Sequence, residues 1–439
     1  FIELADKSEL AIRKIIETAA ASKSAPGSET RKIGDLYRSY MDVEAREKAG
    51  LKPIQKELNR IAKLQSKLDL PRFFAELERL GVDTPFGSYV SQDAKQATRY
   101  VLYVSKEHLG LPDRDYYLNE APRFVEIRAA YVDYLGKILG AAGVKDPAAS
   151  AKAVLAFETQ LAQAQWDRVK NRDREATYNP RTVAELGALT SGFDWKAYFK
   201  AAGTSKAPAI IVRQPDYLTA AAKVMRDTPL PTLRAYFTAK VMSEAAPYLT
   251  RELDEASFAF YGKTLTGAEE QRPQWKRAVG LVNGTLGEAV GKIYVAEHFS
   301  PESKTRMQEL VKNLLAAFDE SIDTLEWMSP ETKKQAKDKL SRFTVKIGYP
   351  DKWRSYAALK ISPTDLLGNV HRANAFEYQR MIGRLGKPID RDEWRMTPQQ
   401  VNAYYMSTMN EIVFPAAILQ PPFFDPNADD AVNYAGSAA

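Results

Sequence analysis

The chain has no cysteine among its 439 residues. It therefore has no disulfide framework, no thiolate zinc site and no cysteine nucleophile, although this absence does not select a redox compartment. No run of about 18 apolar residues occurs, so we expect no membrane-spanning helix. Glycine and proline number 23 and 24, close to the average share of about 12%, which excludes collagen-like and low-complexity chains.

The chain also has no large excess of either positive or negative charge. Lys and Arg number 62 against 56 Asp and Glu, a net charge of +6, and no long basic block follows the pattern of a phosphate-binding segment. We therefore expect no nucleic-acid partner. The chain opens at Phe1 without Met, which suggests that the natural N-terminus, with any signal peptide, has been removed.

The usual catalytic signatures are missing as well. The three histidines, His108, His298 and His371, do not have the spacing of a metal-binding pair. No nucleophile elbow, phosphate-binding loop or dinucleotide fingerprint is present. The segment Asp425–Asp429 resembles the start of a calcium loop but lacks the required Gly and Glu, and a polar turn is the better interpretation.

Helix signals dominate what is present. Ser300 and Pro301 are typical of a helix start, and the apolar residues that follow recur on one helical face: Met307, Leu310, Val311, Leu314, Leu315, Phe318, Ile322 and Leu325. Ser329 begins a second helix of the same kind, which we expect to end at Gly348 and Pro350.

Strand signals are few and short. Tyr89-Val90 and Tyr100–Val104 predict a hairpin, and Ile210–Val212 is a further candidate strand. Glu411–Phe414 precedes Pro415 and is expected to pair along a sheet edge. The region of residues 30–290 is therefore mainly helical with one small β element, whereas the last quarter mixes helix and strand.

The segment from Phe414 to Phe424 is unusually apolar and contains three prolines. One interpretation is a buried core strand that leads into a rigid turn. The other is an aromatic-lined pocket beside an edge strand that accepts extended peptides. The residues alone assign no reaction.

Together with Val401–Tyr405, this segment resembles the substrate-binding motifs of the neprilysin family of zinc metallopeptidases, which includes endothelin-converting enzymes and bacterial oligopeptidases. The resemblance covers nearly the whole chain, through Gly110–Leu118, Arg172-Asp173, Thr177–Asn179, Ser329–Lys333, Ile347–Pro350, Gly386–Pro388 and Asp392–Trp394.

The resemblance implies a mainly α fold with two lobes. It implies a lead-in segment at residues 1–29 and a helical cap lobe with a small β-hairpin at residues 30–290. Residues 291–439 would form the front part of a thermolysin-like α+β catalytic lobe, with a substrate-binding edge strand. Asn402 and Ala403 would hold the substrate backbone, and Ile418 and Phe423 would line the pocket for the residue after the cleaved bond.

The family's zinc helix, His-Glu-x-x-His, does not occur in this sequence. Asn433–Gly436 matches the approach to that helix, and we expect the zinc ligands to lie beyond Ala439. This chain would then carry no catalytic or metal-binding residue of its own and would be inactive alone, although in the complete enzyme zinc would activate a water molecule.

The leading hypothesis is therefore a zinc-dependent endopeptidase or oligopeptidase that cleaves peptides before apolar residues. Its partners would be peptide substrates and the remainder of the catalytic domain, and its location would be extracytoplasmic, periplasmic or secreted, by family analogy. The alternative is a non-catalytic helical module that binds peptides. A helical scaffold for nucleic acid is a third, weaker hypothesis.

Overall fold

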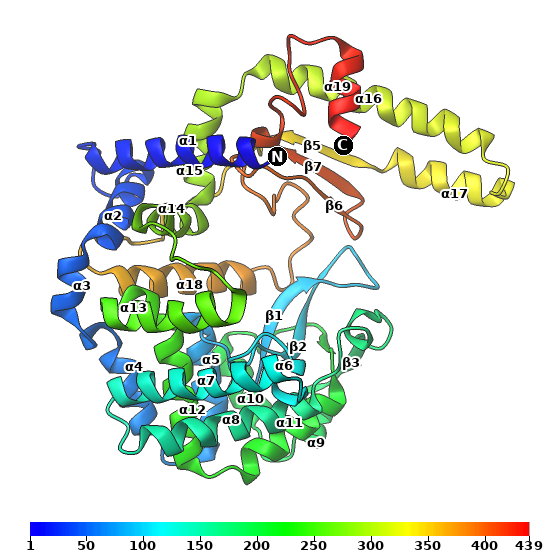
Figure 1. Ribbon diagram of the computed structural model, residues 1–439. Coiled ribbons are helices and arrows are strands. Elements are labelled where there is room, and N and C mark those ends of the chain that lie inside the picture. Colours follow the sequence, from blue (N-terminus) through cyan, green and yellow to red (C-terminus); the bar gives the residue numbers. More distant parts are fainter. Residues whose placement is uncertain (439) are drawn as a thin grey trace. The chain divides into compact units, whose positions relative to one another are not determined.

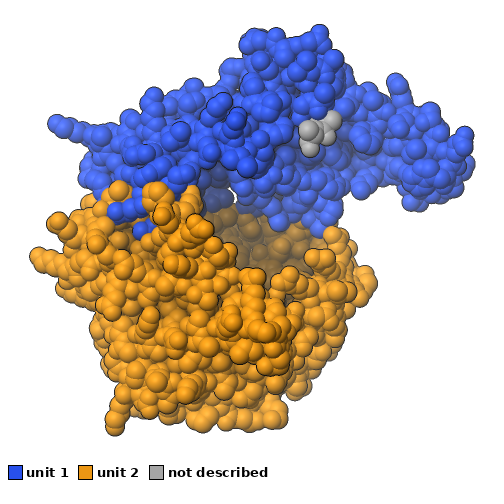
Figure 2. Space-filling model, viewed as in Figure 1, with its two compact units in different colours: residues 1–38, 274–360, 390–439 blue, residues 39–273, 361–389 orange. Residues whose placement is uncertain are grey.

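The computed structural model describes residues 1–438 and divides into two compact units (Figures 1 and 2). Unit 1 comprises residues 1–38, 274–360 and the chain from residue 390 onward, and unit 2 comprises residues 39–273 and 361–389. Helices make up most of both units, which confirms the expected mainly α fold.

Unit 1 is a helical layer with one small sheet. Its helices are α1 (Ile2–Ala21), α14 (Gln274–Thr285), α15 (Gly287–His298), α16 (Pro301–Thr324), α17 (Pro330–Ser341) and α19 (Asp430–Ala438), and its strands are β5 (Thr344–Gly348), β6 (Tyr404–Met406) and β7 (Glu411–Pro415). Helix α2 (Glu29–Met41) carries the chain from unit 1 into unit 2.

Helix α1 is an integral part of unit 1. Helix α1 buries one apolar face, which includes Ile12, Ile15 and Ile16, and it packs against α14 and α15. Lys276 of α14 reaches Glu9 at 2.7 Å. The spacing of these isoleucines gives the helix a continuous apolar stripe, which has to be covered.

The helix starts at Ser300 and Ser329 are confirmed. The Ser300 hydroxyl accepts a hydrogen bond from the Ser303 amide at 3.1 Å, and Ser329 accepts one from Thr332 at 3.2 Å, which satisfies amides that the helix leaves unpaired. The predicted end of the second helix is wrong. Helix α17 stops at Ser341, and the β-branched segment after it forms β5 by pairing with β7.

The sheet of unit 1 has the strand order β5-β7-β6. The expected edge position of residues 411–414 is therefore wrong, because β7 lies in the centre, parallel to β5 and antiparallel to β6. Pro415 ends β7 and so does not interrupt the ladder. A buried ion pair between Lys346 of β5 and Glu411 of β7, at 2.8 Å, joins two of the strands.

Unit 2 is the larger helical body. Its helices are α3 (Val43–Ala49), α4 (Gln55–Ala62), α5 (Leu70–Leu80), α6 (Asp115–Leu118), α7 (Pro122–Ala141), α8 (Pro147–Ala164), α9 (Val183–Leu189), α10 (Trp195–Ala202), α11 (Pro215–Asp227), α12 (Leu230–Ala245), α13 (Arg251–Ser257) and α18 (Leu366–Ile382). A π-helical segment, Phe258–Leu265, continues α13.

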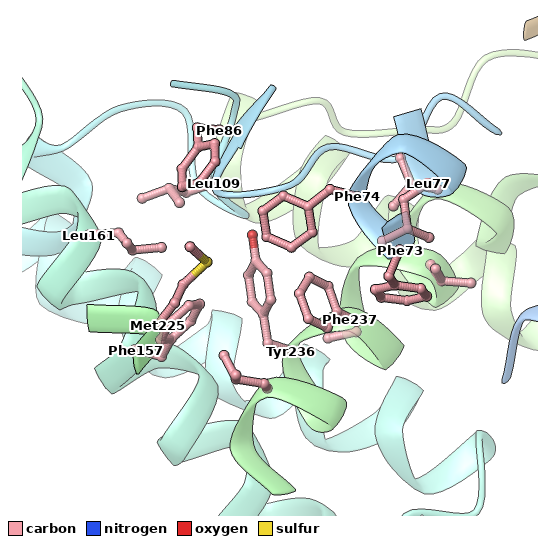
Figure 3. Close-up of a cluster of buried hydrophobic side chains, with 14 of the residues drawn as sticks. Phe73, Phe74, Leu77, Phe86, Leu109, Phe157, Leu161, Met225, Tyr236 and Phe237 are labelled. Atoms are coloured by element: carbon pink, nitrogen blue, oxygen red, sulfur yellow. The ribbon is translucent and has the colours of Figure 1, made fainter. Parts of the chain in front are cut away.

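The predicted hairpin is confirmed as β1 (Phe86–Gln92) and β2 (Tyr100–Lys106), and the candidate strand at residue 210 is confirmed as β4 (Ile210–Val212). With β3 (Asn179–Arg181), which the sequence analysis missed, they form one sheet in the order β1-β2-β4-β3. An aromatic core lies beside this sheet (Figure 3). Phe74 contacts the rings of Phe86 and Phe237 at centroid distances of 5.6 and 5.7 Å.

The two compact units divide the chain after residues 38, 273, 360 and 389, and the lobe boundaries expected at residues 29/30 and 290/291 stay a prediction. Residues 361–389 return to unit 2 because α18 packs against α5. The Asn374 amide donates to the Leu80 carbonyl at 2.7 Å, and the Tyr378 hydroxyl donates to the Ala202 carbonyl at 3.0 Å. Contacts between segments so distant along the chain leave no local signature in the sequence.

Candidate functional site

A cavity of about 230 Å³ opens in unit 1 between the start of β6 and the segment after β7. All four residues predicted to bind substrate line it: Asn402, Ala403, Ile418 and Phe423. The structure thus brings the four residues together, while their role in binding a substrate stays a prediction. The remaining lining residues are Phe1, Met307, Phe414, Leu419, Gly436 and Ser437.

Asn402 and Ala403 lie directly before β6, which pairs with β7 on one side only among residues 1–438. Asn402 is exposed, and its side-chain oxygen accepts a hydrogen bond from the Ala403 amide at 2.8 Å. Its Nδ2 group donates to no atom within the described part of the chain. A side-chain donor thus stands beside an unpaired strand edge, an arrangement that suits an extended peptide.

Ile418 and Phe423 belong to the segment that follows β7. Ile418 ends a short 3₁₀ turn, Ala416–Ile418, and both side chains are half-buried. The Phe423 ring makes an edge-to-face contact with Phe1 at a centroid distance of 6.4 Å. The next residue, Phe424, is only 2% exposed and belongs to the hydrophobic core of unit 1. Of these two neighbouring rings, only that of Phe423 lines the cavity.

Helix α19 contacts the segment that follows β7. The Asn433 side chain, 2% exposed, accepts from the Asp425 amide and donates to the Asp425 carbonyl, both at 2.8 Å. Gly436 lies so close that a Cβ atom there would stand 2.7 Å from the Phe423 carbonyl oxygen and 2.9 Å from that of Pro422. The shape of the cavity wall therefore depends on a glycine at position 436.

The sequence analysis missed the lining residues that come from other segments. Met307 of α16 is 1% exposed and lines the cavity together with Leu419. The helical spacing of Met307 predicts burial but does not say which segment covers it. The only sequence signal at Gly436 was that residues 433–436 match the family segment before the zinc helix. This match does not predict the contact of Gly436 with residues 422 and 423.

Two family models match the chain. Both are described as peptidase family M13, and they match residues 1–350 and 402–439. The chain belongs to peptidase family M13. This is the family of neprilysin-type zinc metallopeptidases, and the membership confirms the resemblance seen in the motifs.

Relatives of this M13 chain include endothelin-converting enzyme 1 of Bos taurus, 30% identical, and of Homo sapiens, 31% identical, each over 99% of the chain. The chain spans about 60% of the length of these curated relatives. Among solved structures, the Mycobacterium tuberculosis zinc metalloprotease ZMP1 in complex with an inhibitor superposes with a TM-score of 0.93 at 43% identity, over 100% of this chain and 67% of that one. PEPO of Lactobacillus rhamnosis, 24% identical, shares the fold with a TM-score of 0.84 over 99% and 69% of the two chains.

Members of the M13 family depend on zinc, but residues 1–438 of this chain do not fit a zinc site. Within residues 1–438, no three His, Cys, Asp or Glu side chains gather in a way that could hold a metal ion. The segment Asp425–Asp429 forms a polar turn: Asp425 accepts from the Asn427 amide at 2.9 Å and Asp429 from the Ala431 amide at 2.8 Å. Over the same residues, no helix combines the length and apolarity needed to cross a membrane.

Proposed function

We propose that this chain carries the substrate-binding part of a zinc metallopeptidase that cleaves peptides before apolar residues. The observation that supports the proposal is the cavity itself. Asn402, Ala403, Ile418 and Phe423, which the family motifs select as substrate-binding residues, come from separate segments and line the same space. In this proposal the substrate backbone lies along Asn402, Ala403 and the outer edge of β6.

The backbone part of the proposal rests on hydrogen-bonding capacity. A peptide unit needs one acceptor and one donor to replace the water that it loses on binding. The Asn402 side chain can supply a donor through Nδ2, which has no partner within the described residues. Because β6 pairs with only one neighbour there, its other edge can supply the remaining groups.

The side-chain part rests on the size and lining of the cavity. At about 230 Å³ it is smaller than the ~300–1,000 Å³ pockets that enclose drug-sized ligands, so it suits one side chain rather than a whole peptide. Phe414, Ile418, Leu419 and Phe423 give it a largely apolar wall. We therefore expect Phe or Leu to be preferred directly after the cleaved bond.

The catalytic residues would lie outside this chain. In this proposal, residues 30–290 form much of the cap lobe, and residues 291–439 form the front part of a catalytic lobe that a further segment with the zinc ligands completes. Leu314 and Phe318, 39% and 63% exposed, lie on the same face of α16 as the buried Met307 and Val311. The apolar face of α16 is thus exposed between a buried stretch at Met307 and Val311 and the buried Ile322, and an exposed apolar stretch of this kind suits a contact with another segment.

The deciding experiment is peptide hydrolysis by the full-length protein that contains this chain. We expect hydrolysis that a chelator abolishes and zinc restores, with cleavage before large apolar residues. Peptide binding by the full-length protein without chelator-sensitive hydrolysis would instead support the alternative, a non-catalytic peptide-binding module. That alternative remains a candidate because no metal-binding group occurs within residues 1–438.

An extracytoplasmic location, periplasmic or secreted, is part of the same proposal. Its support is the family analogy. Fractionation of cells that express the full-length protein from its own gene would test it. Retention of the protein in the cytoplasmic fraction would contradict it.

A further inference from the structure

Two glutamate side chains of unit 2 meet beside a glycine at the start of the β1–β2 hairpin. Glu78 lies in the last turn of α5, and Glu107 directly follows β2. A Cβ atom on Gly87 of β1 would lie 2.0 Å from Glu107 Oε1 and 2.7 Å from Glu78 Oε1. The two carboxylate oxygens therefore cannot be farther apart than the sum of these two distances, which is short for two negative charges.

Glu107 binds the chain that leads into β1 directly, and Glu78 reaches β1 through a tyrosine hydroxyl. Glu107 Oε2 accepts from the Thr84 amide at 2.6 Å and from its hydroxyl at 3.3 Å. Glu78 Oε1 accepts from the Tyr198 hydroxyl at 2.6 Å, and that hydroxyl lies 2.8 Å from Ser88 Oγ. Glu107 thus holds residue 84 by two hydrogen bonds, and Glu78 is linked to residue 88 through the Tyr198 hydroxyl.

The second oxygen of Glu78 supports a neutral acid at this position. Glu78 Oε2 is buried and accepts no hydrogen bond within residues 1–438. A buried carboxylate oxygen without a donor is costly when the group is charged and costs much less when the group is protonated. Burial and the neighbouring charge of Glu107 therefore favour the protonated form of Glu78 and outweigh the hydrogen bond from Tyr198, which favours the charged form.

Two cations only partly offset the charge of the pair, because Arg79 lowers the pKa of Glu78 and Lys240 lowers that of Glu107, each by less than burial raises it. Lys240 of α12 donates to the His108 carbonyl at 3.0 Å, and Arg79 donates to the Ala201 carbonyl, and among residues 1–438 neither donates a hydrogen bond to the pair. Asp83 adds a third carboxyl group, whose charge acts on Glu107. The titratable and charged groups that act on the pair are Arg79, Asp83, Tyr198, Tyr217, Tyr236, Lys240 and Tyr378, and Glu244 and His108 lie next to Asp83 and Lys240 rather than to the pair.

We propose that Glu78 and Glu107 share one proton near neutral pH and act as a pH-sensitive clamp on the entry to the β1–β2 hairpin. When the pair holds its proton, it ties residues 84–88 to α5 and α10. When the proton leaves, two negative charges face each other beside Gly87, and the clamp loosens. The proposal concerns unit 2 alone and does not depend on the proposed peptidase function.

The direction of the pH effect follows from the protonation equilibria. Burial, followed by the charge of Asp83, raises the pKa of Glu107 from 4.5 to about 7, and burial, followed by the charge of Glu107, raises the pKa of Glu78. A carboxyl group with a raised pKa in the folded state stabilises that state below its unfolded pKa, and this contribution is lost as the pH rises through the folded pKa. For Glu107 alone, the unfolding equilibrium constant should rise about 30-fold from about pH 5.5 to about pH 8.

The test compares the pH dependence of unfolding in the 439-residue chain and in Glu107→Gln, Glu78→Gln and the double variant. Gln keeps the shape and an acceptor oxygen but cannot titrate. We expect the rise in the unfolding constant between the two pH values to shrink about tenfold or more in Glu107→Gln and further in the double variant. Glu126→Gln, an exposed substitution on α7, should behave like the wild type.

Hydrogen exchange at about pH 8 tests the clamp itself. The amides of residues 84–92 should exchange more slowly in Glu107→Gln than in the wild type at the same pH. An unchanged pH dependence in the double variant would overturn the proton-sharing pair, and equal exchange rates would overturn the clamp. If the Gln variants do not fold, infrared spectroscopy of the wild type decides, because the absence of any carboxylic-acid carbonyl band at about pH 6 would refute a bound proton.

Discussion

Phe423→Ala offers the sharpest test of the substrate pocket. The Phe423 ring forms part of the cavity wall and is half-buried, with Phe1 as its aromatic neighbour. Removing the ring should widen the cavity without opening the hydrophobic core, which Phe424 rather than Phe423 helps to form. The expected loss therefore falls on substrates that fill the cavity.

The magnitude follows from apolar burial. A Phe side chain that enters the cavity gains about 1.5–3 kcal/mol over an exposed one, which corresponds to a preference over Ala of about 10- to 150-fold. Without the Phe423 ring, we expect the preference for Phe over Ala after the cleaved bond to fall by about tenfold. Because Phe423 is only half-buried, its removal should destabilise the fold by less than the ~3–5 kcal/mol of a core Phe→Ala change.

The assay measures kcat/KM of the full-length protein on two peptides that differ only in Phe or Ala after the cleaved bond, and the melting temperature of each variant. Phe424→Ala is the matched control, since this neighbouring ring is 2% exposed and does not line the cavity. It should lower the melting temperature strongly and leave the Phe/Ala preference unchanged. A uniform loss of activity with a large drop in melting temperature for Phe423→Ala would reject the pocket assignment.

Three further predictions concern the same unit. Asn402→Ala should lower kcat/KM, by an amount that corresponds to about 0.5–1.5 kcal/mol of transition-state stabilisation for each lost hydrogen bond to substrate. The melting temperature should stay nearly unchanged, because Asn402 is exposed. Normal activity of the variant would contradict a role of Asn402 in binding substrate. The 439-residue chain alone should retain no zinc after dialysis and hydrolyse no peptide, since residues 1–438 contain no ligand cluster; chelator-sensitive turnover by this chain would contradict that. Gly436→Ala should lower the melting temperature and weaken peptide binding, because its Cβ would lie 2.7 Å from the Phe423 carbonyl oxygen. The control is Gly284→Ala, which has open space around it and should be neutral or stabilising. Equal melting temperatures of the two variants would refute the close contact at residue 436.

Sequence patterns with a local cause were read correctly. The caps at Ser300 and Ser329 depend on residues three positions apart, and the β1–β2 hairpin joins two strands that are neighbours along the chain. The same logic failed where a distant segment decides the outcome. Helix α17 stops at Ser341 because the next residues pair with β7, about 70 residues further along the chain.

Buried polar pairs were beyond the reach of the sequence for the same reason. Glu78 and Glu107 are separated by a helix end and a complete hairpin, and neither lies in a motif. Gly87 lets them approach, but a glycine within a strand has several possible causes. Only the fold shows that this glycine faces two carboxyl groups rather than solvent.

The candidate substrate pocket falls between these two cases. Its predicted residues lie within 402–423, so one stretch of sequence carried both the family resemblance and most of the apolar wall. The other surfaces come from α16 and α19, and their fit depends on the burial of Met307 and the bare backbone of Gly436. A change at either position should therefore alter which side chains the pocket accepts while leaving Asn402 and the β6 edge in place. Selectivity and backbone binding should thus be separable by mutation, as expected if distinct segments supply them.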